Sequence, residues 1–367
     1  MRKLLTTMIA TVMVAGIAAG NEPAYAAASE WKVAQMRDLP NLTVESITVA
    51  PTGSAWSIGT KIVDGKYESV LQHLTSKGWV GVALPASVQG WLSAVDASSS
   101  KNVWMFGVTS PSNSPHRPKY AARWNGTRWT KTPLPSDFQV SDAAALSAND
   151  VWAADRQQYR GYYLEHWNGK SWKKVAVPFR VHGITALSSK DIWAAGNNKG
   201  QPGVMHWNGS KWSVAKTPKV KLPPNNETAG APLRDIAVVS SKNIWAVGEM
   251  AWECGNDDYH CQRPLSMHWD GSKWSAVLEP EAPNTYTKVV PDGSGGVWAL
   301  QGSYDPSLVH IVGTKVTRES PPSAGDNGIG LGALAAHGKT VWAGGDTTFG
   351  TSGEPDYSPY GVYLRTG

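Results

Sequence analysis

The sequence contains little phenylalanine, little cysteine and few charged side chains. Its 367 residues include 4 Phe against 19 Trp, 2 Cys, and 17% charged residues. So low a charge content does not suit a coiled coil, and 41% hydrophobic residues exclude a disordered chain. The 37 Gly and 24 Pro suit a chain of many strands and turns. A general preference for aromatics would raise Phe and Trp together, so Trp must occupy a specific, recurring position.

Long hydrophobic runs are lacking except at the start of the sequence. Arg2 and Lys3 precede the largely apolar run Leu4–Ala19, and the small-x-small pattern Ala24-Tyr25-Ala26 follows it. This order predicts a signal peptide over residues 1–26 and a secreted, extracellular mature chain over 27–367, with no membrane span after cleavage. An uncleaved anchor is the alternative, although the run is short for a span of about 20 residues.

The two cysteines, Cys254 and Cys261, are the only ones in the chain. Outside the cytosol such a pair forms a disulfide by default. Metal binding would need further ligands, and His260 and Asp257 between them match no zinc-binding spacing. We therefore expect a Cys254–Cys261 disulfide that constrains one loop.

The common catalytic and cofactor motifs are also missing. There is no Gly-rich phosphate loop, no H-E-x-x-H, no G-x-S-x-G and no EF-hand pattern. The net charge of +5 is modest and its positive residues are spread along the chain. Nucleic-acid binding is therefore not expected. We expect no cofactor, no metal and no catalytic residue that can be named from a motif, in a chain that is a monomer.

A motif built around tryptophan recurs along the whole chain. It reads turn residue, apolar residue, Trp, then two small or apolar residues that are often followed by Gly, as in Asp191-Ile192-Trp193-Ala194-Ala195-Gly196. The seven copies are centred on Trp56, Trp104, Trp152, Trp193, Trp245, Trp298 and Trp342. A second motif follows several copies, as in His206-Trp207-Asn208-Gly209-Ser210-Lys211-Trp212. Because Asn-Gly or Asp-Gly between apolar runs is a strong hairpin signal, we expect a tight hairpin in these units. Units one and six keep degenerate forms, at Lys77–Trp79 and Gly313–Val316.

Seven units of this kind predict an all-β fold, a seven-bladed β-propeller with four antiparallel strands, a to d, in each blade. Strand a is an Ala/Val/Leu run such as Asp142–Leu146, strand b carries the first Trp, and the hairpin joins strands c and d. Glu30–Val33 is similar to the d strand Trp172–Val175, and the chain stops after the c strand Gly361–Leu364. The N-terminal strand should therefore complete the seventh blade. Six and eight blades are the rival counts.

These repeats resemble those of secreted β-propellers of actinobacterial type, which carry S-x-x-D-V-W-A-V-G and H-W-D-G-x-x-W motifs. Here the first motif is Ser188–Gly196 and the second is the group of four hairpins that includes His206–Trp212. The resemblance covers essentially all of the mature chain and implies the fold and export, but no activity. The hairpins lack the Ser-x-Asp-x-Gly order of sialidase-like propellers, so sialidase chemistry is not implied.

The repeated tryptophans are expected to pack between blades, because each buries about 150–250 Å². A sugar-binding stripe is the alternative reading of the same residues. His166, His206 and His268 each precede a Trp on strand c, so we expect a repeated packing or hydrogen-bonding role for them as well.

Ligand contact is expected on the face of the ring that holds the b–c and d–a connections, here called the loop face, because these connections vary in length and chemistry. Long b–c loops are expected over Val108–Tyr120, Glu249–Pro264 and Asp346–Tyr360, and long d–a loops over Lys216–Pro232 and Glu319–Gly330. Aromatic residues in or beside these connections could contact a ligand or could pack the loops. Such aromatics are Tyr120, Tyr159, Tyr162, Trp252, Tyr259, Tyr286, Tyr304 and Tyr357, and the candidates for ligand contact among them are Tyr120, Tyr159, Trp252, Tyr259, Tyr286 and Tyr304.

Two adjacent columns at the start of strand a are rich in polar residues and should ring the mouth of the central channel. One column reads Glu45, Ser93, Ser141, His182, Arg234, Thr287 and Leu331, and the next reads Ser46, Ala94, Asp142, Gly183, Asp235, Lys288 and Gly332. The candidates for ligand contact are Glu45, Asp142, His182, Arg234, Asp235 and Lys288. A wet funnel lined with paired polar groups is the alternative.

Two functions remain open at this point. The first is a secreted binding module that recognises a glycan, a cell-wall polymer or an extracellular protein through the loop face. The second is an extracellular carbohydrate-active hydrolase or lyase. It would need paired carboxylates at a suitable separation, for which Glu45, Asp142 and Asp235 beside His182 are the candidates.

Overall fold

The computed structural model describes residues 31–36, 39–64, 66–88, 90–109, 119–135, 139–155, 161–224, 226–254, 260–349 and 359–367. The expected signal peptide over 1–26 and the candidates Tyr159 and Tyr259 lie outside the described residues. None of the helices in the described ranges is long and apolar enough to cross a membrane.

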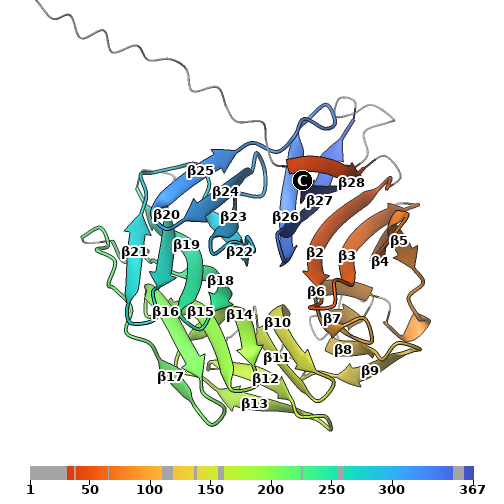
Figure 1. Ribbon diagram of the computed structural model, residues 1–367, viewed down its shortest axis with the longest axis horizontal. Helices are drawn as coiled ribbons and strands as arrows, with labels where there is room; N and C mark the ends of the chain where they lie inside the picture. Colours follow the sequence, from red (N-terminus) through yellow and green to blue (C-terminus); the bar gives the residue numbers. More distant parts are fainter. Residues whose placement is uncertain are drawn as a thin grey trace, which may run out of the picture.

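Seven four-stranded antiparallel sheets are arranged around a central channel, so the predicted seven-bladed propeller is confirmed (Figure 1). Blades one and two contain β2 (Leu42–Val49), β3 (Ala55–Val63), β4 (Lys66–Thr75) and β5 (Gly78–Val82), then β6 (Gly90–Ser99), β7 (Asn102–Thr109), β8 (Lys119–Trp124) and β9 (Trp129–Pro133). Blades three and four contain β10 (Val140–Ser147), β11 (Asp150–Asp155), β12 (Tyr163–Trp167) and β13 (Trp172–Ala176), then β14 (Arg180–Ser188), β15 (Asp191–Asn198), β16 (Gln201–Trp207) and β17 (Trp212–Val214).

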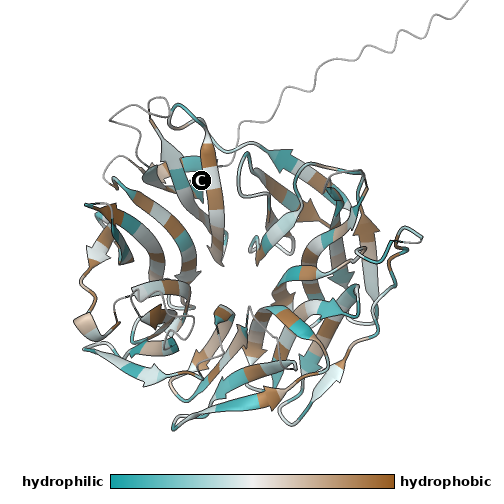
Figure 2. Ribbon diagram, turned by 180° about the vertical axis from the view of Figure 1, so that it is seen from behind, coloured by the Kyte–Doolittle hydropathy of each residue, from teal (hydrophilic) through white to brown (hydrophobic). Residues whose placement is uncertain are grey.

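The remaining blades follow the same order. Blades five and six contain β18 (Leu233–Ser240), β19 (Asn243–Glu253), β20 (His260–Trp269) and β21 (Trp274–Leu278), then β22 (Tyr286–Pro291), β23 (Val297–Gln301), β24 (Ser307–Val312) and β25 (Lys315–Glu319). Blade seven contains β26 (Ile329–His337), β27 (Thr340–Thr348), β28 (Pro359–Thr366) and β1 (Trp31–Gln35). A short 3-10 helix, Ala86–Val88, precedes β6. Hydrophobic and hydrophilic segments are mixed along the strands (Figure 2), and b strands such as β7 and β23 are buried over most of their length, because each blade packs between two neighbours.

The N-terminal strand closes the ring, as the sequence predicts. β1 pairs antiparallel with the C-terminal strand β28, with Trp31 opposite Thr366 (Figure 1, red beside blue). The Trp31 ring is 2% exposed and meets the ring of Trp298 in blade six edge-on, with centroids 5.2 Å apart. The first and last strands of the ring thus lie in one sheet, in which β1 is the outer strand of blade seven.

Tryptophan pairs join neighbouring blades, which confirms their structural role. In six of the seven interfaces, the strand-b Trp of one blade meets the strand-d Trp of the next at a steep angle, for example Trp104 with Trp172 at 87° and Trp152 with Trp212 at 84°. In the seventh interface Val316 takes the place of the ring and packs in the cluster of Trp245. Edge-to-face contacts of this kind add about 0.5–1.5 kcal/mol beyond the buried area.

Each strand-b Trp also has a partner across the sheet on strand c. Trp152 stacks on His166 with centroids 4.1 Å apart, and His166 Nε2 lies 2.8 Å from Asp150 Oδ1. The same arrangement recurs with His73, His206, His268 and His310. Arg123 replaces the histidine in blade two and Arg365 in blade seven. The expected packing and hydrogen-bonding role of His166, His206 and His268 is confirmed.

The Cys254–Cys261 disulfide is present, with Cα atoms 5.7 Å apart. It lies at the end of β19 and β20, which are longer than the sequence suggests. The expectation of an irregular loop over Glu249–Pro264 is wrong, because Glu249 pairs with Pro264 and the ladder continues to Glu253 opposite His260. The d–a connection before β18 lies against this hairpin, since Gly230 and Ala251 exchange backbone hydrogen bonds.

Candidate functional site at the channel mouth

A cavity of about 570 Å³ runs along the centre of the ring. Every blade contributes its inner strand to the wall, from Glu45 and Ser141 near the loop face to Pro51 and Leu187 near the opposite face. Four of the six predicted channel candidates line it: Glu45, Asp142, Asp235 and Lys288. Asp96, which the sequence argument missed, also lines it.

The inner-strand carboxylates bind backbone N–H groups of the next blade. Asp142 Oδ2 accepts the Ile184 N–H of blade four at 2.8 Å, and Asp235 Oδ2 accepts the Val289 N–H of blade six at 2.9 Å. Asp96 accepts the Thr48 hydroxyl of blade one at 2.8 Å and the Ala145 N–H of blade three at 2.6 Å. These three side chains therefore hydrogen-bond neighbouring blades together around the channel.

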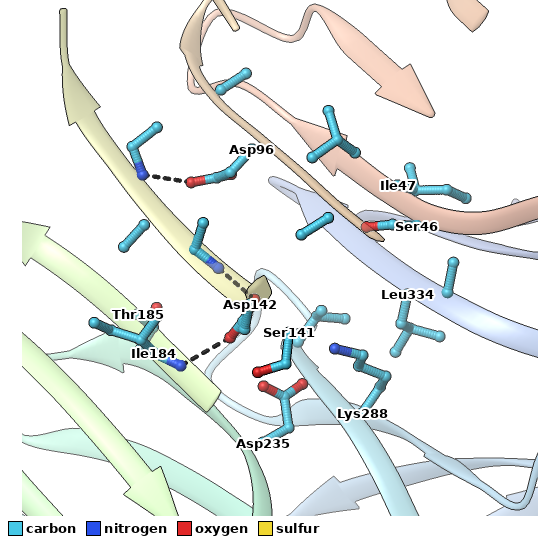
Figure 3. A pocket seen from close by; sticks show the side chains of 18 of the residues that line it. Ser46, Ile47, Asp96, Ser141, Asp142, Ile184, Thr185, Asp235, Lys288 and Leu334 are labelled. Carbon is cyan, nitrogen blue, oxygen red and sulfur yellow. Dashed lines mark hydrogen bonds between the residues drawn. The ribbon is translucent and has the colours of Figure 1, made fainter. Parts of the chain in front are cut away.

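Burial in the channel shifts these carboxyl groups toward the neutral form. Burial raises the pKa of Asp142 to about 7; Lys288 opposes the rise, whereas Asp235 and Asp96 add to it. Burial also raises the pKa of Asp235 and of Asp96. In Figure 3 the ammonium of Lys288 points toward Ser141 and Asp235. The channel thus holds one ammonium among three carboxyl groups with raised pKa.

A β-bulge lies near the start of strand a in every blade. The pairing register shifts there at Glu45, Ser93, Ser141, His182, Arg234, Thr287 and Gly332. A bulge changes the direction of a side chain. Glu45 and Ser141 line the cavity from this position, whereas His182 and Arg234 are not among its lining residues.

His182, Arg234 and Glu45, three of the bulge residues, contact protein groups near the loop face. His182 Nδ1 lies 2.7 Å from the carbonyl oxygen of Leu233, and burial together with the charges of Arg234 and Arg180 lowers its pKa to about 4. Arg234 forms an ion pair with the buried Glu249, which also accepts the Thr285 hydroxyl at 2.8 Å. Glu45 Oε1 accepts the Thr60 hydroxyl at 2.6 Å.

Two of the predicted surface aromatics are buried. Tyr120 is 0% exposed and donates its hydroxyl to the Val88 carbonyl at 2.7 Å. Tyr286 is also 0% exposed, and its hydroxyl donates to Glu279. Their expected ligand contact is therefore wrong, because the rings fill the core between blades. Trp252 is half-buried against the core of blade five, whereas Tyr304 is 87% exposed.

Two exposed aromatics, Tyr67 and Trp91, were missed by the sequence argument, and they are 70% and 53% exposed. Tyr162, which the sequence argument places beside a connection, is 45% exposed. Tyr67 and Tyr162 lie where strand c begins, and Trp91 lies at the start of strand a. Together with Tyr304 they are all the exposed large aromatics of the described residues, and all four lie on the loop face. Only the Asp64-Gly65 turn signal before Tyr67 could have placed one of them.

No cluster of His, Cys, Asp and Glu side chains that could hold a metal ion occurs within the described ranges. No family model matches the sequence, and no curated protein matches it.

Solved structures match the fold. YCF48 bound to D1 peptide is similar with a TM-score of 0.55 at 11% identity, over 92% of this chain and 95% of that chain. The Pan2 WD40 domain of Neurospora crassa has a TM-score of 0.55 at 11% identity, over 92% and 95%. The WD40 β-propeller domain of Doa1 has a TM-score of 0.54 at 11% identity, over 91% and 96%. At this identity the similarity shows the propeller fold.

Proposed function

We propose that this protein is an extracellular binding module that holds a macromolecular partner on its loop face. The observation that carries the proposal is the distribution of exposed aromatics: Tyr67, Trp91, Tyr162 and Tyr304 all lie on that face. Exposed large apolar side chains mark interaction sites, and Trp and Tyr are the residues that most often dominate binding energy.

The chemistry of the channel favours binding over hydrolysis. Both oxygens of Asp142 accept backbone N–H groups, from Ala143 and Ile184. Both oxygens of Asp235 do the same, with Ile236 and Val289. A carboxylate held in this way by the ring contributes to the packing of the blades, so the paired-carboxylate mechanism of the alternative hydrolase or lyase has little support.

Two further observations support the proposal. The disulfide between Cys254 and Cys261 fits an oxidising, extracellular compartment, as does the signal-like start of the sequence. Among the similar folds, YCF48 was solved bound to a peptide, and we infer that the present propeller likewise offers one face as a binding surface.

A pelleting assay tests the proposal. Mature protein is mixed with insoluble bacterial cell walls, chitin or cellulose, and the pelleted protein and any released soluble sugar are measured. We expect saturable pelleting without sugar release, and loss of pelleting in a variant with Tyr67, Trp91, Tyr162 and Tyr304 changed to Ala. The matched control changes four exposed outer valines to Thr: Val33, Val80, Val214 and Val277.

Three outcomes would contradict the proposal. The first is pelleting by the four-aromatic variant as strong as that of the wild type. The second is pelleting with none of the materials. The third is soluble sugar that increases with time, which would point to the hydrolase or lyase alternative and to the channel carboxylates.

A further inference from the structure

The most unusual surface feature of the described residues is a stacked pair of exposed aromatic rings. Tyr67 on β4 and Trp91 on β6 have centroids 6.4 Å apart and planes inclined by 21°. The side chains are 70% and 53% exposed, so most of each ring faces solvent. In every other ring pair found in the described ranges, at least one of the rings belongs to a residue that is buried or half-buried.

The fold does not require this pair. The interblade tryptophans recur from blade to blade and contact one another. Trp91 has no aromatic counterpart, because the matching positions of blades one and four hold Thr43 and Arg180. Neither ring belongs to a core cluster of the described residues. Exposing two large rings without a packing role indicates a binding role.

Both rings are held on regular strands. Tyr67 lies opposite Ile62, next to the pair Val63 and Lys66 at the end of the hairpin. Trp91 lies opposite Val108, and a Cβ at the neighbouring Gly107 would lie 2.5 Å from the Trp91 carbonyl oxygen, so Gly107 permits this close strand pairing. A platform fixed by strands loses little freedom on binding, which favours a rigid ligand.

The surroundings indicate the class of ligand. The described residues include six exposed large aliphatic side chains: Val33, Val80, Val214 and Val277 on outer strands, Leu187 at the a–b end of β14 and Val312 at the c–d end of β24. None of them lies on β4 or β6, the strands that carry the ring pair. Within the described ranges the two flat rings are therefore not part of a larger apolar patch, whereas the buried core of a protein–protein interface is more apolar than the rest of the surface.

We infer that the Tyr67–Trp91 pair is a stacking platform for a sugar ring, which makes the partner of the loop face a glycan. The inference rests on the proposed binding function. The flat C–H face of a pyranose covers an aromatic ring, while the hydroxyls at its edge remain free to form hydrogen bonds with water or with polar groups.

The test compares single variants that keep the fold. Tyr67→Ala and Trp91→Ala remove one ring each, Trp91→Phe keeps a ring, and Val80→Thr changes an exposed side chain on the outer strand of blade one. Binding is measured with chitin, cellulose, protease-treated cell walls and a glycan array, and thermal unfolding checks that each variant is folded. We expect Trp91→Ala and Tyr67→Ala to weaken binding roughly tenfold, which is about 1.4 kcal/mol. Trp91→Phe should stay within a few-fold of the wild type, and Val80→Thr should bind as the wild type does.

The outcomes separate this inference from the proposed function. Wild-type binding that protease treatment of the walls abolishes, with no binding to pure polysaccharides or the array, would overturn the glycan platform and leave a protein-binding loop face. Equal glycan binding by the wild type, Tyr67→Ala and Trp91→Ala would also overturn it, even if the four-aromatic variant fails to pellet. Equal pelleting by the four-aromatic variant and the wild type would overturn both the glycan platform and the proposed binding function.

Discussion

The side chain of Gln35 forms two hydrogen bonds with the backbone of Trp79. Its Nε2 donates to the Trp79 carbonyl at 3.1 Å, and the Trp79 N–H donates to Gln35 Oε1 at 2.7 Å. Gln35 lies at the end of β1 in blade seven, and Trp79 lies on the outer strand of blade one. The Gln35 amide thus forms with the Trp79 backbone the two hydrogen bonds that a neighbouring strand could form. It links blades seven and one, where the ring closes.

Removing this link should weaken the closed ring. Gln35→Ala leaves the N–H and the carbonyl of the buried Trp79 without these partners, which costs about 1–3 kcal/mol for such groups. Urea unfolding of the variant measures the loss in free energy of unfolding. Lys32→Ala, an exposed change on the same strand, is the control and should lie within about 0.5 kcal/mol of the wild type. Equal stability of the two variants would contradict a closing role for Gln35.

The role of Asp235 can be decided by stability rather than by activity. Asp235→Asn places an amide NH₂ against one of the two backbone N–H donors, Ile236 or Val289, that the carboxylate now accepts. We expect the free energy of unfolding to fall by about 1–3 kcal/mol, measured by denaturant unfolding. A variant with the stability of the wild type and a lost sugar-releasing activity would favour the catalytic alternative.

Stability should depend on pH through Asp142. Burial raises its pKa to about 7 in the folded chain, so between about pH 4 and pH 7 the folded state binds more protons than the unfolded state. The free energy of unfolding therefore falls as the pH rises through this window. Unfolding curves from pH 4 to pH 8 should show a smaller fall for Asp142→Asn than for the wild type. The exposed Asp270 is the control, because turn hydrogen bonds, first that of the Ser272 side chain, lower its pKa to about 2, outside the window. Parallel curves for Asp142→Asn and the wild type would contradict the assignment.

The histidines stacked on strand-b tryptophans should be replaceable by arginine. His206 stacks on Trp193 with centroids 4.3 Å apart and contacts Asp191, whereas blades two and seven carry Arg123 and Arg365 at this place. We expect His206→Ala to cost about 1–2 kcal/mol and His206→Arg to cost clearly less, because guanidinium retains both the stacking and the contact with the carboxylate. Guanidinium-chloride unfolding of the two variants gives the comparison. An arginine variant as unstable as the alanine variant would show that the blades do not share this arrangement.

Loss of the disulfide should affect the hairpin more than the ring. Changing Cys254 and Cys261 to Ser releases a short loop, for which chain entropy predicts roughly 2–3 kcal/mol. The β19–β20 ladder below it and the contacts with residues 226–231 remain. Circular dichroism should show an intact β-structure, and hydrogen exchange should increase at the end of the hairpin. Complete unfolding of the double variant at room temperature would contradict this local role.

The sequence predicts the ring well because its strongest signals are local. Asn-Gly and Asp-Gly turns require positive φ and fix hairpins, as the φ of 88° at Gly169 and 94° at Gly209 shows. Recurring tryptophans mark the same strand in each blade. These signals predict the number of blades. They also predict closure by β1, because Trp31 resembles the tryptophans of the d strands.

Counting residues back from the strand-b Trp gives the wrong bulge position in blade seven. The reason is that a β-bulge cannot be recognised from the number of residues between motifs. In blades two to five a second register shift precedes the a–b turn, for example between Ala186 and Ser188. Blade seven has no such shift, and Ala335 lies opposite Trp342. Strand a of blade seven is therefore displaced by one residue relative to the columns that were counted from the strand-b tryptophans. The bulge falls at Gly332, where the count from Trp342 suggests Leu331.

The aromatic candidates depend on contacts between blades that no local pattern reveals. Tyr120 lies opposite Gly107, a residue without a side chain, and its ring enters the core between blades one and two. Tyr67 and Trp91 meet across the same two blades at the surface. The sequence argument selected Tyr120 and passed over Tyr67 and Trp91, although all three are aromatics near a connection. Burial separates them, and burial depends on the neighbouring blade.

The pairing of β1 with β28 also determines the order in which the molecule can be completed. A chain synthesised from its N-terminus must keep Trp31 unpaired until Thr366 exists, since these residues face each other in the finished ring. The earlier blades form from neighbouring segments, but this contact spans nearly the whole chain and carries the largest loop-closure entropy. Ring closure should therefore be the last and slowest structural step in folding. Until it occurs, the edge of β28 is open to strands from other molecules.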